Sequence, residues 1–131
     1  MYSERDDWIG IIQEFLDKPI TPDWEDKTPE ERRAWVRGDS LEQWDELDLV
    51  PRETVSGVEI RVECFGDDRA GIKGNDFTGR RISRIMGQMP GWKKLEKLVK
   101  TKGYGPQRVY VRTGSEAHKR YEIAEEFRKY I

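Results

Sequence analysis

The stretch that decides the fold is NDFTGRRISRIMGQMPGW, residues 75–92. Its apolar side chains recur at helical spacing and predict one buried stripe, formed by Ile82, Ile85, Met86 and Met89. Asn75 or Asp76 is suited to cap the helix, and the Pro90–Gly91 pair ends it. The polar side chains fall on the other faces and are candidates for one exposed surface: Arg80, Arg81, Arg84 and Gln88. We therefore expect a cationic helix over residues 77–88.

The chain after this helix changes its period. Two β-rich runs, 98–102 and 108–113, flank the sequence GYGP, which is typical of a hairpin turn. The hairpin carries further cations, with Tyr104 expected at its tip: Lys100, Lys102, Arg108 and Arg112. We expect a basic β-hairpin directly after the cationic helix.

The segment before the helix, 54–66, fits two structures. Val58, Ile60, Val62 and Cys64 alternate as in a strand, whereas Val55, Val58, Val62 and Phe65 have helical spacing. Thr54 or Ser56 is placed to cap such a helix and Gly66 to end it. A helix here would give the order helix, turn, helix, basic hairpin, which is that of a winged helix-turn-helix.

This order predicts an α+β, mostly helical fold: a winged helix-turn-helix over 51–113, an N-terminal helical and acidic extension over 1–50, and a C-terminal helix over 114–131. In such a fold the second helix, here 77–88, enters the major groove of DNA and the hairpin, here 98–113, rests beside it. The candidate DNA-binding residues are Lys73, Thr78, Arg80, Arg81, Arg84, Gln88, Lys100, Lys102, Tyr104, Gln107, Arg108 and Arg112. Lys93, Lys94 and Lys97 extend this patch toward phosphates.

The flanking parts have clear helical signals. Residues 6–17 place one apolar stripe on a helix with two aspartates at its start; the stripe is Trp8, Ile11, Ile12, Phe15 and Leu16. Residues 28–38 have a capping box of Thr28 and Glu31, Pro29 at the first helical position, and Gly38 as the stop. Residues 39–53 are an acidic connector, and 115–130 predict a last helix. Trp24, Trp35 and Trp44 are expected to pack between the N-terminal pieces.

The charge is small in sum and uneven in layout. The 131 residues carry a net charge of −2. Residues 1–68 hold 8 Lys/Arg against 20 Asp/Glu, or −12, whereas residues 69–113 hold 12 against 2, or +10. Such a cationic span favours a polyanion, and nucleic acid is the commonest one. The alternative is that the acidic and basic segments fold onto each other and neutralise.

The order and spacing of several segments resemble a known family. VPRETVSGVEIRVECFGDD (50–68), RRISRIMGQMPGWKK (80–94) and GYGPQRVYVR (103–112) resemble the C-terminal region of the virulence-associated E family, phage, prophage and plasmid replication proteins of the primase-helicase type. WIGIIQEFLDKPI and TPEERRAWVRGD look like the segments that precede that region. The resemblance implies that 54–66 is helical and that the chain is a DNA-binding appendage of an ATPase motor. The chain has no G-x-x-x-x-G-K-[ST] loop, so it is either an excised piece, which its start favours, or a protein that kept only this module.

Other classes have weaker support. Cys64 is the only cysteine and His118 the only histidine. We expect Cys64 in the core and His118 on the surface. We expect the chain to have no metal site, no cofactor and no active site. The sequence has no apolar run long enough to predict a membrane span, and we expect a cytoplasmic location. The partners expected are duplex DNA and a helicase or primase domain of the same parent chain. A protein-interaction module that docks on a motor or oligomer partner, and single-strand binding with Tyr104 and Trp92 as stacking platforms, are the alternatives.

Overall fold

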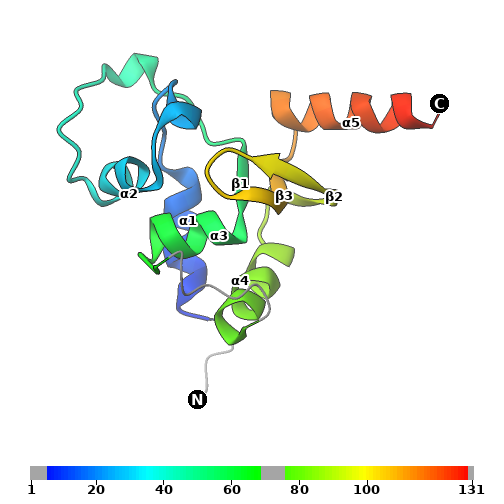
Figure 1. Ribbon diagram of the computed structural model, residues 1–131, viewed down its shortest axis with the longest axis horizontal. Helices are drawn as coiled ribbons and strands as arrows, with labels where there is room; N and C mark the ends of the chain where they lie inside the picture. Colours follow the sequence, from blue (N-terminus) through cyan, green and yellow to red (C-terminus); the bar gives the residue numbers. More distant parts are fainter. Residues whose placement is uncertain (1–5, 69–75, 130–131) are drawn as a thin grey trace.

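The computed structural model describes residues 6–68 and 76–129. Across them the protein is α+β, with five α-helices and a three-stranded antiparallel sheet of order β1-β3-β2 (Figure 1). The elements are α1 (Trp8–Asp17), the 3₁₀ turn η1 (Trp24–Asp26), α2 (Pro29–Arg37), the 3₁₀ turn η2 (Glu46–Asp48), β1 (Thr54–Ser56), α3 (Gly57–Glu59), the π-helix η3 (Ile60–Cys64), α4 (Phe77–Gly87), β2 (Trp92–Thr101), β3 (Gly105–Arg112) and α5 (Glu116–Arg128).

The N-terminal helices start and stop near the expected residues. The Thr28–Glu31 capping box of α2 is present, and Gly38 ends the helix in the left-handed region at φ 80°. In α1 the buried side chains are Ile12, Phe15 and Leu16. The expectation for Ile11 was wrong, because its side chain is 46% exposed. The buried face of α1 is rotated toward Ile9, which packs against the core, and this leaves residue 11 outside the stripe.

Residues 54–64 form a short strand followed by a helix, so each of the two expected structures is present in part. Thr54–Ser56 form β1, which pairs with β3 in the register Val55↔Tyr110, and the helix begins only at Gly57. The expectation of one helix over 54–66 was therefore wrong for its first three residues. Ser56 ends the strand and caps the helix: its hydroxyl accepts from the Glu59 N–H at 3.3 Å, while the Glu59 carboxylate accepts from the Ser56 N–H at 3.2 Å. A capping serine at a strand end turns the chain directly into the helix.

The hairpin is longer than expected. β2 starts at Trp92, six residues before the predicted run, and the register with β3 shifts between Lys94 and Leu98. A bulge of this kind breaks the two-residue alternation, so the first half of the strand has no strand-like pattern. β2 is an edge strand, since it pairs with β3 alone.

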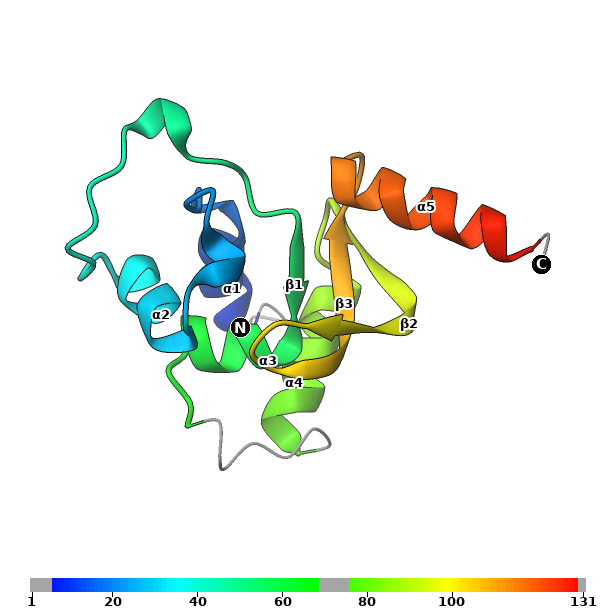
Figure 2. The same cartoon turned by 45° about the horizontal axis from the view of Figure 1, so that its top comes forward.

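One core joins elements from both halves of the chain. Its buried residues come from α1, β1, η3, α4, the turn after α4, and β3: Ile12, Phe15, Leu16, Val55, Ile60, Ile82, Ile85, Met86, Met89 and Tyr110. Trp24 is buried, whereas Trp35 and Trp44 are half-buried. Figure 2 shows α1 beside this core, the connector 39–53 arching out at one end of the molecule, and α5 projecting at the other.

The start of α5 corrects the expectation for His118, which is buried. A left-handed turn at Gly114, φ 83°, folds the first turn of α5 onto the body, where Ala117 is also buried. The His118 Nδ1 accepts from the Gly114 N–H at 3.0 Å, and Nε2 lies 3.0 Å from a Glu122 oxygen. The ring thus holds the helix start in place. No helix within the described ranges is long and apolar enough to cross a bilayer.

Candidate nucleic-acid interface

The start of α4 is fixed by an ion pair with η3. Asp76 caps α4 by accepting from the Gly79 N–H at 2.8 Å. Arg61 of η3 donates to both Asp76 oxygens, at 2.7 and 2.9 Å, and lies 3.3 Å from Asp67. The hydrogen bonds from Arg61 lower the pKa of Asp76. A bidentate guanidinium–carboxylate pair fixes orientation as well as distance, so it sets the angle between η3 and α4.

Arg81 does not belong to the exposed surface expected of it. Its Nε donates to Asp6 at 2.6 Å, a second guanidinium nitrogen donates to the other Asp6 oxygen, and the group lies 3.7 Å from the ring centre of Trp8. The hydrogen bonds from Arg81 lower the pKa of Asp6 to about 2. The helical spacing placed Arg81 at the edge of the polar face, and α1 occupies that side. Arg81 therefore holds α1 against α4.

The remaining polar face of α4 is open to solvent. Arg80, Ser83, Arg84 and Gln88 are exposed and Thr78 is half-buried. The Arg84 side chain is 66% exposed, with its guanidinium 3.9 Å from Asp6, a separation at which an exposed pair contributes little. Lys73 and Asn75 lie outside the described residues. Ser83 was not among the predicted residues, although it occupies the same face as Arg80 and Arg84 by helical spacing.

Two hairpin arginines make hydrogen bonds to backbone carbonyls within the protein. Arg112 donates to the carbonyls of Arg52 and Leu16, each at 2.8 Å. Its guanidinium lies 4.7 Å from the Trp92 ring centre and so covers one face of that indole. Arg108 is exposed, and its Nη1 donates to the Leu95 carbonyl at 3.3 Å and to that of Glu96, across the bulge in β2. Both arginines hold backbone segments together as well as carrying charge.

The turn of the hairpin is folded onto the helices. The Tyr104 hydroxyl donates to Glu63 of η3 at 2.7 Å, and Gln107 donates to the Tyr104 carbonyl at 3.0 Å. Lys102 lies 3.0 Å from Asp26, an exposed pair. Tyr104 is half-buried, so it is not the free tip residue that the sequence indicated. No sequence pattern indicated Glu63, because its position is decided by the packing of α2, η3 and the hairpin.

Glu63 belongs to a buried ionic cluster, defined here as Arg32, Arg52, Glu59 and Glu63. Arg32 lies 3.5 Å from Glu63 and Arg52 3.7 Å from Glu59, and the Arg52 guanidinium lies 4.2 Å from the Phe15 ring centre. Burial and the nearby Glu59 raise the pKa of Glu63 to about 7, against the opposing effect of Tyr104 and the two arginines. The cluster joins α2, the 54–64 segment and the hairpin.

A cleft of about 400 Å³ lies where α3, η3, α4 and β3 meet. It is lined by Gly57, Val58, Arg61, Gly79, Ile82, Ser83, Tyr104, Gln107, Arg108 and Tyr110. Ser83 and Arg108 face the same cleft, so the polar face of α4 and the hairpin border each other. Arg61 also lines this cleft, and no sequence motif indicated its place there.

The lysines of the edge strand lie on both faces of the sheet: Lys94 is opposite Tyr110, whereas Lys93 is opposite Val111 and, against expectation, does not extend the basic surface of α4. Lys93, Lys94, Lys97 and Lys100 are exposed, and within residues 6–68 and 76–129 none of them lies in an ion pair. Lys94 is opposite Tyr110 in the register, and Tyr110 packs into the core with α4. Directly opposite residues share a face of the sheet, so Lys94 lies on the side of α4. The acidic and basic halves therefore neutralise each other only in part, through Asp6, Asp17 and Asp26.

The described residues offer little for metal or nucleophile chemistry. Within them no three His, Cys, Asp or Glu side chains gather as a metal site. Burial raises the pKa of the Cys64 thiol to about 11, which disfavours the reactive thiolate. No protein-family model matches the chain, and the search against curated proteins finds no match.

Proposed function

We propose that this protein binds duplex DNA through a winged helix-turn-helix, in which α3–η3 is the first helix, α4 the recognition helix and β2–β3 the wing. The element order β1, α3–η3, α4, β2, β3 and the sheet order β1-β3-β2 support this assignment. The observation that carries the proposal is the shared cleft, which is lined both by Ser83 of the polar face of α4 and by Arg108 of the hairpin.

In this proposal Arg80 and Arg84 contact the major groove or its phosphates. Guanidinium groups on a groove-entering helix bind phosphates or take guanine O6 and N7 together. Lys94 and Lys100 contact the backbone as point charges, and Arg61 and Arg81 hold the helix at its angle. Tyr104 is excluded from stacking on bases while its hydroxyl is bound to Glu63.

The resemblance to the virulence-associated E family adds the context. We propose that the module places a helicase or primase of the same parent chain on DNA. The resemblance covers roughly residues 5–113 and supports this role by the order of the segments, although the chain itself has no motor motif.

A binding titration tests the proposal. Fluorescence anisotropy of a labelled random duplex at two salt concentrations is expected to show binding that weakens steeply with salt. The double variant Arg80→Ala/Arg84→Ala is expected to lose roughly 1–3 kcal/mol per contact. The control Lys119→Ala removes an exposed cation of α5 and leaves the affinity unchanged. Equal affinity of the double variant and the wild type would overturn the assignment of α4.

A further inference from the structure

The connector between α2 and β1 has an acidic strip, defined as residues 39–50. It holds five carboxylates and no Lys or Arg. Asp39 and Glu42 pair with Arg37 and Lys27. The other carboxylates, Asp45, Glu46 and Asp48, are exposed, and within the described residues they lie in no ion pair. Among residues 6–68 and 76–129, the strip therefore presents three carboxylates that no cation pairs with.

The same strip exposes two leucines. Leu41 is 97% and Leu47 91% exposed. The segment is held at its end by the Ile20↔Val50 bridge, and Asp45 caps η2 by accepting from the Leu47 N–H at 3.1 Å. Burial of a leucine side chain is favourable, so two leucines exposed to water within one acidic segment have the composition of a contact surface.

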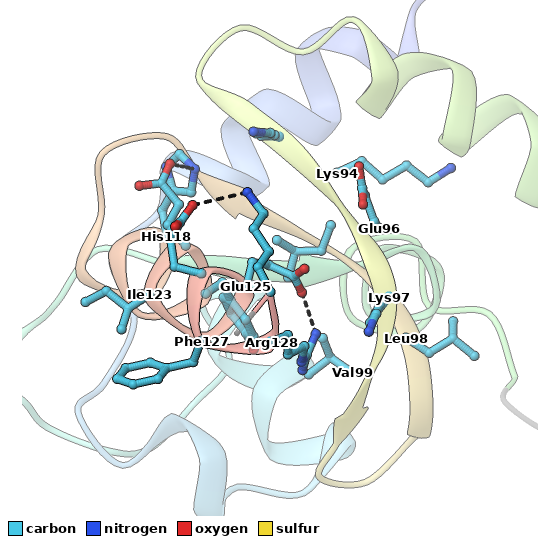
Figure 3. Close-up of a pocket in the computed structure, with 16 residues that line it drawn as sticks. Lys94, Glu96, Lys97, Leu98, Val99, His118, Ile123, Glu125, Phe127 and Arg128 are labelled. Carbon is cyan, nitrogen blue, oxygen red and sulfur yellow. Dashed lines mark hydrogen bonds and ion pairs between the residues drawn. The ribbon is translucent and has the colours of Figure 1, made fainter. Parts of the chain in front are cut away.

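A groove of about 860 Å³ lies at the other end of the molecule, between β2 and α5. Figure 3 shows Lys97 and Val99 facing Arg128 across it, with Ile123 and Phe127 projecting from the flank of α5 turned away from β2. Ile123 is 57% and Phe127 68% exposed. The α5 charges are compensated within the helix by the pairs Glu125–Arg128 and Glu126–Lys129. Outside these pairs, the charged residues that line the groove are three lysines of β2, Lys93, Lys94 and Lys97, and two glutamates, Glu96 and Glu122, so the groove keeps a small positive excess.

Most of the α5 helix does not pack against the rest of the described structure. It spans 13 residues, and its buried residues, Ala117 and His118, both belong to the first turn. An isolated helix of this length is marginal in water, because most helical stability comes from an apolar face packed against another element. A partner that covers Ile123 and Phe127 would supply that packing.

We propose that the acidic strip of one copy of this chain binds the β2–α5 groove of a second copy. Leu41 and Leu47 would cover Ile123 and Phe127, and the free carboxylates would approach Lys93 and Lys97. Lys93 is opposite the buried Val111 in the register, which places it on the sheet face away from the proposed DNA contact. Figures 1 and 2 show the strip at one end of the molecule and α5, which borders the groove, at the other. Two different faces on one chain give head-to-tail association, which closes into a ring or continues as a filament.

Sedimentation velocity over a concentration series tests this proposal. The wild type is expected to form species larger than a monomer, fewer at high salt because the contact is charged. The strip variant Leu41→Ser/Leu47→Ser and the groove variant Ile123→Ser/Phe127→Ser are each expected to associate at least tenfold more weakly. The charge variant Lys93→Glu/Lys97→Glu is expected to do the same. The control Phe77→Ser removes an exposed apolar side chain outside both surfaces and leaves association unchanged.

Mixing distinguishes this geometry from other dimers. An equimolar mixture of the strip and groove variants retains one intact strip and one intact groove, so it is expected to give a 1:1 dimer and nothing larger. Circular dichroism of each variant checks that the fold is intact. A wild type that stays monomeric, or a mixture that does not recover the dimer, overturns the proposal. DNA binding by the monomeric variants is measured separately, so that a loss of self-association can be distinguished from a loss of DNA binding.

Discussion

The Glu63 carboxylate shows how single residues connect distant parts of this protein. It has no exposed surface, accepts a hydrogen bond from the Tyr104 hydroxyl and lies near Arg32 and Glu59. These neighbours come from the hairpin, α2 and α3. A buried charge is tolerated only with such partners, so the protonation of Glu63 and the position of the hairpin are linked.

Stability is predicted to fall as the pH rises through the range where Glu63 ionises. Its pKa is raised from 4.5 to about 7 in the folded state. Between these values the folded protein keeps a proton that the unfolded chain has released, so the free energy of unfolding decreases with rising pH. Glutamine at position 63 cannot ionise, so the Glu63→Gln variant is expected to lack this decrease. Across the range the decrease in the free energy of unfolding amounts to up to about 3 kcal/mol, at 1.4 kcal/mol per pKa unit. Urea unfolding at several pH values measures it.

The exposed variant Glu30→Gln is the control, and it is expected to keep the wild-type dependence on pH. A Glu63→Gln curve parallel to the wild type would show that Glu63 does not titrate in this range.

Arg81 and Arg84 are predicted to behave differently although they are three residues apart. Arg81→Ala removes the bonds to Asp6 and the contact with Trp8 and is expected to lower the melting temperature. Arg84→Ala removes an exposed side chain and is expected to lower DNA affinity at nearly unchanged stability. Thermal unfolding and anisotropy on both variants give the comparison, and a stable Arg81→Ala protein would contradict the structural role of that residue.

At the scale of elements, the junction of β1 and α3 depends on one side chain. Ser56 is fully buried, pairs within the sheet and caps the helix. Thr28 performs the same capping at α2, but on the surface. The two caps have equal chemistry and different burial, which makes them a matched pair.

Ser56→Ala is predicted to cost more than Thr28→Ala. Loss of a helix cap typically costs about 0.5–2 kcal/mol. Ser56→Ala also removes the hydrogen bond that the Ser56 hydroxyl donates to the buried Glu59 carboxylate at 3.0 Å, and the loss of a buried hydrogen bond adds to the cost of the lost cap. Chemical denaturation measures both free energies of unfolding, and equal losses would contradict a distinct role for the buried cap.

The hairpin has its own expected signature in DNA binding. Lys94→Ala and Lys100→Ala are each predicted to weaken binding to all sequences alike and to reduce the salt slope by about 0.9, as for one phosphate contact. Affinity measured on two unrelated duplexes over a salt series tests this. Lys129→Ala, on α5, serves as control, and an unchanged slope in the hairpin variants would exclude phosphate contact there.

For the whole molecule, the N-terminal part belongs to the core. Ile12, Phe15 and Leu16 of α1 pack with β1, α4 and β3, and Arg32 of α2 lies beside Glu63. Residues 51–131 alone are therefore predicted to lack cooperative unfolding, because removal of a buried leucine or isoleucine side chain already costs about 2–5 kcal/mol. Thermal melts followed by circular dichroism check this, and a cooperative melt of the shortened chain would show an independent unit.

Short-range sequence patterns alone predicted much of the local structure. Helix spacing and capping residues such as Thr28 and Asp76 predicted α1, α2 and α4, because these signals depend on neighbours within one turn. The hairpin was found from GYGP, but the bulge hid the first half of β2. The same local spacing placed Arg80 and Arg84 on the polar face of α4.

Which polar side chains remain accessible for binding depends on the packing of segments that are distant in the sequence. Arg81 is bound to Asp6 across 75 positions of sequence and Tyr104 to Glu63 across 41. His118 is buried by the turn at Gly114. Ion pairs and burial of this kind depend on which elements lie side by side, and no local pattern encodes that. The charge of each residue was visible in the sequence, whereas its partner was set by packing.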